Sequence, residues 1–331
     1  MSPSEVRVGN AVYRWEEIAF PGEPSAGWAH HGVGVLEDGT VLFARADRAS
    51  LALFDNDGGL RSELETGLTE MHNMTVVQNG EQEAVWVADN GHKFTPHQPR
   101  YSDYVRPGRA VLVSLDDGTI QGEISTPEHE AYERDAWCPT AVAVDEPRLG
   151  GSGEIWVADG YGKSLLHRFT RDGKLLATLD GSESGRVFNT PHDVVIDRRR
   201  ATPELYVADR TNGRIAVFGL GGDYLRDVGA GILTSPSGIA TSGDLLFVTE
   251  LHGRVAVFDG DDEFIGQLGE TDRPESEVWP NALDNVGNTV RPPNLLPGQF
   301  NSPHGVATDA RGTVYVTEWL IGGRLVRLVP N

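Results

Sequence analysis

The chain has 331 residues and a formal net charge of −21, from 49 acidic and 28 basic residues. An acidic surface repels phosphate backbones and anionic lipids, so we expect neither nucleic acid nor a membrane surface as a partner. We find no apolar run of roughly 18 residues and no secretion-signal pattern near the start, and therefore expect no membrane span. The single cysteine, Cys138, excludes an intramolecular disulfide and favours the cytoplasm.

A segment of similar pattern returns six times along the chain. Its first strands are predicted to begin near His31, His72, Thr140, His192, Ser237 and His304. Its second, more apolar strands are predicted at residues 41–43, 85–87, 155–157, 205–207, 246–248 and 314–316. Third strands such as 214–218 and 254–258 alternate as sheet strands do. Six units of three or four antiparallel strands predict an all-β fold, a six-bladed β-propeller forming one domain over residues 1–331.

The two ends of the chain are expected to meet in one blade. The strand-like segment at about residues 11–20 has no unit of its own, and the last unit, 302–331, ends after its third strand. Adding the first segment to the last blade would cover both exposed edges. Three insertions interrupt the repeat, at 93–109, 126–137 and 269–300. Long loops in a compact fold are usually functional, so we expect them to be lids.

Histidine occupies the start of the first strand in the second, fourth and sixth units, as His72, His192 and His304. Blades around an axis bring equivalent positions together, so the three imidazoles are predicted to hold one metal ion. Three histidines with an open fourth position are typical of catalytic zinc, although such sites also take Fe, Co or Mn. His31 stands at the matching place in the first unit. It is interpreted as a fourth ligand, a group supporting the ligands or, as we favour, a structural residue.

Two further positions depart from the repeat. The second strand ends in a carboxylate in five units, at Asp89, Asp159, Asp209, Glu250 and Glu318, and these acids are predicted to be structural. The first unit has Arg45 there, and a guanidinium facing the axis would be an anion receptor. Tyr161 follows the third unit's carboxylate, at a rim position where other units have Arg210, His252 and Trp319. Near zinc its phenol is a candidate base, and packing is the alternative.

The chain resembles the peptidyl-α-hydroxyglycine α-amidating lyases and their bacterial relatives among the NHL-repeat propellers. The resemblance is strongest at residues 41–47, 156–161, 190–193, 207–215 and 302–305. It implies that His72, His192 and His304 hold the catalytic zinc, that Arg45 is the active-site arginine and that Tyr161 is catalytic. A structural calcium is left open, because Gly305 stands where the family has a carboxylate and Asp193 follows a different histidine.

The expected function is a metal-dependent carbon–nitrogen lyase. With Tyr161 as base and Arg45 binding the carboxylate or carbonyl, it would split a carbinolamide of α-hydroxyglycine type into an amide and glyoxylate. The partner is then a small-molecule substrate, and its supply by a separate hydroxylase is left open. Two alternatives remain open: a metal-dependent propeller hydrolase such as a lactonase or esterase, and a non-enzymatic NHL interaction scaffold.

Overall fold

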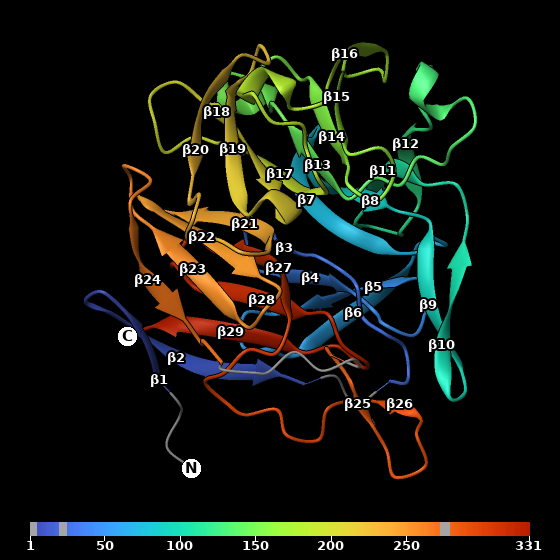
Figure 1. Cartoon of the computed structure of the whole chain (residues 1–331), viewed down its shortest axis with the longest axis vertical. Helices are drawn as coiled ribbons and strands as arrows, with labels where there is room; N and C mark the ends of the chain where they lie inside the picture. The colour runs from blue at the N-terminus through green and yellow to red at the C-terminus, as the bar shows by residue number, and fades with distance from the viewer. Residues whose placement is uncertain (1–4, 20–24, 272–278) are drawn as a thin grey trace.

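The computed structural model describes residues 5–19, 25–271 and 279–331, and arranges six antiparallel sheets in a ring (Figure 1). This confirms the predicted all-β, six-bladed propeller. Helical structure in the described residues is limited to four short 3-10 turns, namely η1 (Glu130–Tyr132), η2 (Pro147–Leu149), η3 (Ser182–Ser184) and η4 (Arg210–Asn212). In the same residues, none of the helical turns has the length and apolar character needed to span a bilayer.

Each of the first five blades is a four-stranded sheet. Blade 1 contains β3 (Val33–Val35), β4 (Val41–Ala44), β5 (Ser50–Phe54) and β6 (Leu60–Glu65). Blade 2 contains β7 (Met71–Asn79), β8 (Gln82–Asp89), β11 (Arg109–Ser114) and β12 (Ile120–Ile124). Blade 3 contains β13 (Ala141–Val144), β14 (Ile155–Asp159), β15 (Leu165–Phe169) and β16 (Leu175–Leu179).

The remaining blades repeat this order. Blade 4 contains β17 (Pro191–Asp197), β18 (Glu204–Asp209), β19 (Arg214–Gly219) and β20 (Tyr224–Val228). Blade 5 contains β21 (Pro236–Ser242), β22 (Leu245–Glu250), β23 (Arg254–Phe258) and β24 (Phe264–Leu268). Blade 6 contains β27 (Pro303–Thr308), β28 (Val314–Glu318) and β29 (Leu325–Pro330), extended by β2 (Ala11–Ile18) and β1 (Glu5–Val8). The first strand of each blade contacts those of its two neighbours, so these six strands line the centre of the ring.

The core of the molecule lies between the blades. Six hydrophobic clusters of buried residues each join one blade to the next, because the second and third strands carry apolar side chains on both faces. In blade 4, for example, Leu205 and Val207 of β18 pack against blade 3, whereas Tyr206 and Ala208 pack against blade 5. This two-sided burial explains why the second strands are uninterrupted apolar runs in the sequence.

The N-terminal strand closes the ring as predicted. β2 pairs antiparallel with β29, from Tyr13 opposite Pro330 to Ile18 opposite Leu325. The Trp15 side chain is 4% exposed, and its ring centroid lies 4.6 Å from that of Phe300. The last blade therefore combines strands from both ends of the chain.

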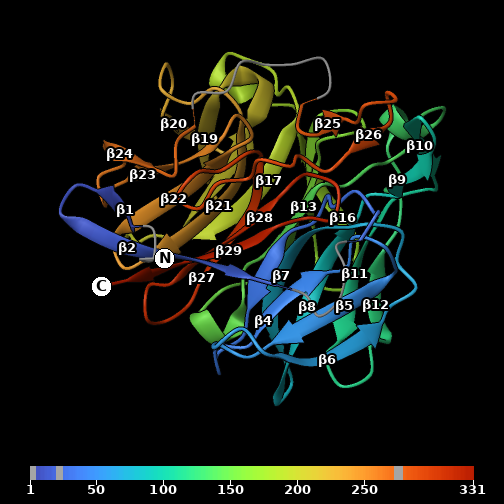
Figure 2. The ribbon, with the colours of Figure 1, turned by 90° about the horizontal axis from the view of Figure 1, so that it is seen from below.

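The predicted insertions contain structure of their own. Most of 93–109 forms a hairpin of β9 (His92–His97) and β10 (Arg100–Val105), and 269–300 contains the short hairpin of β25 (Ala282–Leu283) and β26 (Thr289–Val290). Residues 272–278 of that insertion lie outside the described part. Both hairpins lie at the same side of the molecule (Figure 2), where the Thr289 amide donates to the Pro99 carbonyl at 2.8 Å. Whether they act as lids stays a prediction.

Candidate metal centre and catalytic site

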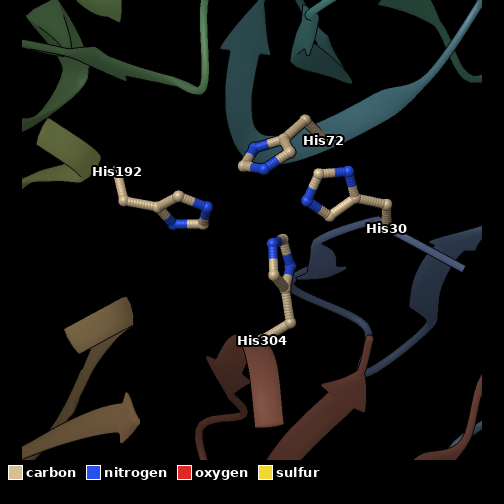
Figure 3. Close-up of side chains that lie close together, drawn as sticks. All are labelled: His30, His72, His192 and His304. Atoms are coloured by element: carbon tan, nitrogen blue, oxygen red, sulfur yellow. The ribbon is translucent and has the colours of Figure 1, made fainter. Parts of the chain in front are cut away.

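Four buried histidines converge where the first strands meet (Figure 3). One ring nitrogen from each of His30, His72, His192 and His304 lies within 4.8 Å of the others. His72, His192 and His304 come from β7, β17 and β27, the first strands of alternate blades. The structure thus brings the three predicted histidines together and adds His30, from the segment before β3, which the sequence analysis did not select.

The three histidines of alternate blades are oriented in one way. The Nδ1 atom of each lies within hydrogen-bond distance of a backbone carbonyl at the same register of the next blade. The pairs are His72 with Thr140 at 2.7 Å, His192 with Ser237 at 2.6 Å and His304 with His31 at 3.3 Å. An Nδ1–H donated to a carbonyl leaves Nε2 as the free lone pair, which is how proteins commonly hold metal-binding histidines. Blades 2, 4 and 6 thus supply rings, and blades 3, 5 and 1 supply the carbonyls that orient them.

Burial keeps these rings neutral. Loss of solvation lowers the pKa of His72 to about 3, and lowers the pKa values of His192 and His304 well below the ordinary range. The Nε2 atom of His304 is buried and has no hydrogen-bond partner among the described residues. Because neutral imidazoles with converging lone pairs are good ligands for zinc, the residues present fit a bound metal ion.

The two adjacent histidines of blade 1 occupy different places. His31, at the register of the other ligands, offers its carbonyl to His304, and its ring packs 5.5 Å from that of Phe43. The His30 ring reaches the cluster, with its centroid 4.7 Å from that of His72 and 4.9 Å from that of His304. Among the described residues no carbonyl holds its Nδ1, which is buried without a hydrogen-bond partner there. The adjacent histidines His30 and His31 were the sequence signal that could have identified His30. Only His31 stands at the repeated position, so the repeat alone points to His31.

Tyr161 lies against the histidine cluster. It follows β14, and its Oη lies 2.9 Å from His192 Nε2, 3.0 Å from His30 Nε2 and 3.3 Å from His72 Nε2. The single phenol proton can be donated to only one of these three nitrogens. The imidazole nitrogens around Tyr161 Oη therefore offer more lone pairs than the phenol has protons. Burial raises the pKa of Tyr161, and the nearby Arg210 charge opposes that rise. The phenol is therefore placed to exchange a proton with a group bound at the cluster.

Arg210 supplies the cation of this site. It follows Asp209 at the end of β18 and donates to Tyr161 Oη at 3.2 Å and to Ser237 Oγ at 3.1 Å. Its Nε is buried and has no hydrogen-bond partner in the part of the chain that the structure describes. Arg210 is one of the rim residues that vary between the units of the sequence, and no role was predicted for it. The available signal was its position directly after a repeated carboxylate.

Arg45 contacts other groups. Its guanidinium lies 3.3 Å from Asp47 and 3.4 Å from Glu63 of the outer strand β6. It also lines a cavity of about 200 Å³ together with His31 and Arg291. The guanidinium bonded to the tyrosine is that of Arg210, so the active-site role that the resemblance implies for Arg45 stays a prediction.

The repeated carboxylates are structural, as predicted. Each accepts a hydrogen bond from a backbone amide just before the first strand of its own blade. The pairs are Asp89 with Glu70 at 2.9 Å, Asp159 with Cys138 at 2.8 Å, Asp209 with Asn189 at 2.8 Å, Glu250 with Ser235 at 3.1 Å and Glu318 with Ser302 at 2.9 Å. These bonds fix the loops that lead into the histidine positions.

The carboxylate of Asp193, which follows the ligand candidate His192, is surrounded by protein donors. Ile239 and Val194 donate their amides at 2.7 and 2.9 Å, and the Asn73 side chain donates at 2.9 Å. Burial raises its pKa to about 7 despite these bonds. Within the described residues, the four histidines are the only group of three or more potential ligands with all donor atoms close together. The structure therefore offers no carboxylate cluster for calcium there.

Sequence comparisons confirm the resemblance to amidating lyases. The chain is 25% identical over 310 residues to the probable peptidyl-alpha-hydroxyglycine alpha-amidating lyase pgal-1 of Caenorhabditis elegans, covering 92% of this chain and 73% of that protein. It is 27% identical over 188 residues to peptidyl-alpha-hydroxyglycine alpha-amidating lyase 2 of Drosophila melanogaster, covering 54% of this chain and 39% of that protein. No family model matches the chain.

Solved structures share the fold at lower identity. A streptogramin B lyase superposes with a TM-score of 0.58 at 16% identity, covering 96% of this chain and 98% of its own. A protein of unknown function from Bacteroides thetaiotaomicron gives a TM-score of 0.64 at 13% identity, covering 99% of this chain and 76% of its own. The chain thus has the architecture of propeller lyases and is similar in sequence to the amidating ones.

Proposed function

We propose that the protein is a zinc-dependent lyase that breaks the C–N bond of an α-hydroxyglycine-type substrate, releasing an amide and glyoxylate. The observation that carries this proposal is the position of Tyr161 Oη, which contacts buried histidine nitrogens and the Arg210 guanidinium together. The similarity to amidating lyases supports the same chemistry.

The metal would be held by His72, His192 and His304, whose rings are oriented by backbone carbonyls, with His30 as a further nitrogen within reach. Imidazole ligands also suit other divalent metals, so zinc is part of the proposal. When bound, the ion lowers the pKa of the substrate hydroxyl and of the neighbouring phenol.

Arg210 binds the substrate carboxylate in this proposal. Its Nε is buried with no partner in the described ranges, and its two terminal nitrogens already donate to Tyr161 and Ser237. A carboxylate beside this guanidinium would satisfy the unpaired N–H and balance the charge. The hydroxyl on the adjacent carbon would then lie towards the phenol and the histidines.

Tyr161, as phenolate, takes the proton of the substrate hydroxyl. As the carbon–oxygen double bond of glyoxylate forms, the C–N bond breaks and its electron pair leaves with the amide nitrogen. That nitrogen receives the proton from Tyr161, which restores the phenolate. The substrate is itself a hydroxylated N-acylglycine, so we propose that a separate hydroxylase supplies it.

The test is glyoxylate release from α-hydroxyhippurate, together with elemental analysis of the protein. Tyr161→Phe keeps the ring and removes the proton acceptor, so we expect turnover to fall about 100-fold or more while the metal content stays unchanged. Full turnover in Tyr161→Phe would remove the tyrosine from the mechanism. Hydrolysis of a lactone without any glyoxylate release from α-hydroxyhippurate would favour the hydrolase alternative.

A further inference from the structure

Aromatic side chains form a row beside the histidine cluster. We call this row the aromatic wall; its members are Trp28, Phe94, Tyr101, Trp279 and Trp319. The ring centroid of Trp28 lies 5.0 Å from that of Phe94 and 5.4 Å from that of Trp319. The ring centroid of His30 lies 5.8 Å from that of Trp319 and 6.1 Å from that of Phe94. The wall therefore meets the candidate catalytic site at His30.

The wall is held in place by polar contacts of the β9–β10 hairpin. Lys93 Nζ lies 2.8 Å from a carboxylate oxygen of the buried Glu70, just before β7. At the other end of the wall, the Tyr101 hydroxyl donates to the Ala26 carbonyl at 2.6 Å. These bonds join the hairpin to blade 2 and to the segment before blade 1. Phe94 thus takes a defined place next to Trp28.

Two indole N–H groups of the wall have no acceptor. The Nε1 atoms of Trp28 and Trp319 are buried and without a hydrogen-bond partner among the described residues, whereas Trp279 Nε1 donates to the Asn301 carbonyl at 3.2 Å. A buried, unpaired N–H is unfavourable, and an acceptor on a ligand would relieve it. The same rings are only half-buried, so part of their surface is free for contact.

The wall and Arg210 approach the tyrosine hydroxyl from different elements of the fold. Arg210 contacts Tyr161 Oη from blade 4, and His30, which touches the wall, contacts it from the segment before blade 1. In Figure 3, His30 lies across the cluster from His192, the blade 4 histidine. A substrate with its carboxylate on Arg210 would therefore extend its other end, the acyl group on nitrogen, towards the wall.

We propose that the aromatic wall binds a flat aromatic acyl group of the substrate and that an indole N–H of the wall donates to the acyl carbonyl. This inference rests on the proposed lyase function and names its substrate class as N-aroyl-α-hydroxyglycines. Aromatic faces stack favourably on aryl groups, beyond the gain from buried area alone. A small aliphatic acyl group would leave most of the wall uncovered.

The experiment compares two substrates that both yield glyoxylate, α-hydroxyhippurate with a benzoyl group and N-acetyl-α-hydroxyglycine. We expect kcat/KM to be about tenfold or more higher for the benzoyl substrate. Trp319→Ala and, separately, Phe94→Ala should bring the ratio close to one, by lowering kcat/KM for the benzoyl substrate more than for the acetyl substrate. Tyr104→Ala is the matched control, because this exposed aromatic lies on the same hairpin outside the wall and should leave the ratio unchanged.

A binding measurement separates the two proposals. Benzamide, the amide product, should bind wild-type protein about tenfold more tightly than acetamide, and Trp319→Ala should remove that difference. Equal kcat/KM for both substrates, or an unchanged ratio in both wall variants, would overturn the wall as an acyl site while leaving the lyase intact. If neither substrate releases glyoxylate, the lyase is overturned, and equal binding of the two amides would then overturn the wall as well.

Discussion

At the level of single residues, the two nitrogens of His72, His192 and His304 have separate roles. Nδ1 is bound to a carbonyl of the next blade, and Nε2 faces the other rings. The His304 ring and the His31 backbone therefore contribute differently. The ring offers its Nε2 to the cluster, whereas the His31 carbonyl orients that ring. Removing the His304 side chain would delete one of the proposed metal ligands, whereas removing the His31 side chain leaves its carbonyl in place.

We therefore expect His304→Ala to lower the affinity for zinc about 100-fold or more, since loss of a ligand exceeds the loss of a supporting contact. His31→Ala should keep the metal. Elemental analysis after dialysis against a weak chelator measures both. Metal loss in His31→Ala alone would instead make His31 a ligand.

The two arginines provide a second comparison. Arg210 contacts the tyrosine, and Arg45 contacts Asp47 and Glu63. We expect Arg210→Ala to raise KM for α-hydroxyhippurate about 30-fold or more, because an unpaired buried carboxylate costs about 2 kcal/mol or more. Arg45→Ala should raise it less. Steady-state kinetics measure KM for both variants. A larger increase in KM for Arg45→Ala than for Arg210→Ala would make Arg45 the active-site arginine.

At the level of strands, β15 carries a buried histidine outside the cluster. His167 is 0% exposed, and its Nε2 and Nδ1 lie 2.7 Å from the Tyr132 hydroxyl and 2.9 Å from the Thr178 hydroxyl. Burial lowers its pKa to about 3, with a smaller effect of His129. In the unfolded chain a histidine titrates near 6.5, so the unfolded state takes up a proton first as the pH falls.

This difference makes the folded state lose stability as the pH drops from neutral through about 6.5 towards the folded pKa. Between pH 7.5 and 5.5 we expect His167 to account for about 1 kcal/mol of that loss. His167→Gln should reduce the pH dependence by this amount in urea unfolding at the two pH values. The exposed His97→Gln is the control, and an equal change in both variants would contradict the assignment.

At the level of the whole molecule, stability depends on closing the ring. β2 covers the edge of β29, and Trp15 joins the cluster of buried residues between blades 5 and 6. Removing residues 1–18 would expose both that edge and that cluster.

We expect the shortened chain to unfold at a lower temperature and to associate through β29, as measured by thermal unfolding and by light scattering after size exclusion. Removal of residues 1–4, which precede β1, is the control. A truncated protein that stays monomeric with an unchanged Tm would show that the N-terminal strands are dispensable.

Repetition in the chain was sufficient to predict the propeller, because strand periodicity, paired turns and two-sided apolar runs are local properties that recur in every blade. The same register selected His72, His192 and His304. The alternation of ring and carbonyl around the centre was not predicted, because a backbone carbonyl leaves no mark in a sequence.

Only the tertiary structure shows which residues beside the repeated histidine positions reach the cluster. His30 lies one residue away from the repeated position, and Arg210 belongs to a rim whose side chains vary from blade to blade. Whether such a side chain reaches the cluster depends on the path of the loop and on packing against neighbouring blades, not on its position in the repeat. The aromatic wall has the same origin, since Trp28, Phe94 and Trp319 are far apart in the chain and meet only after the ring closes.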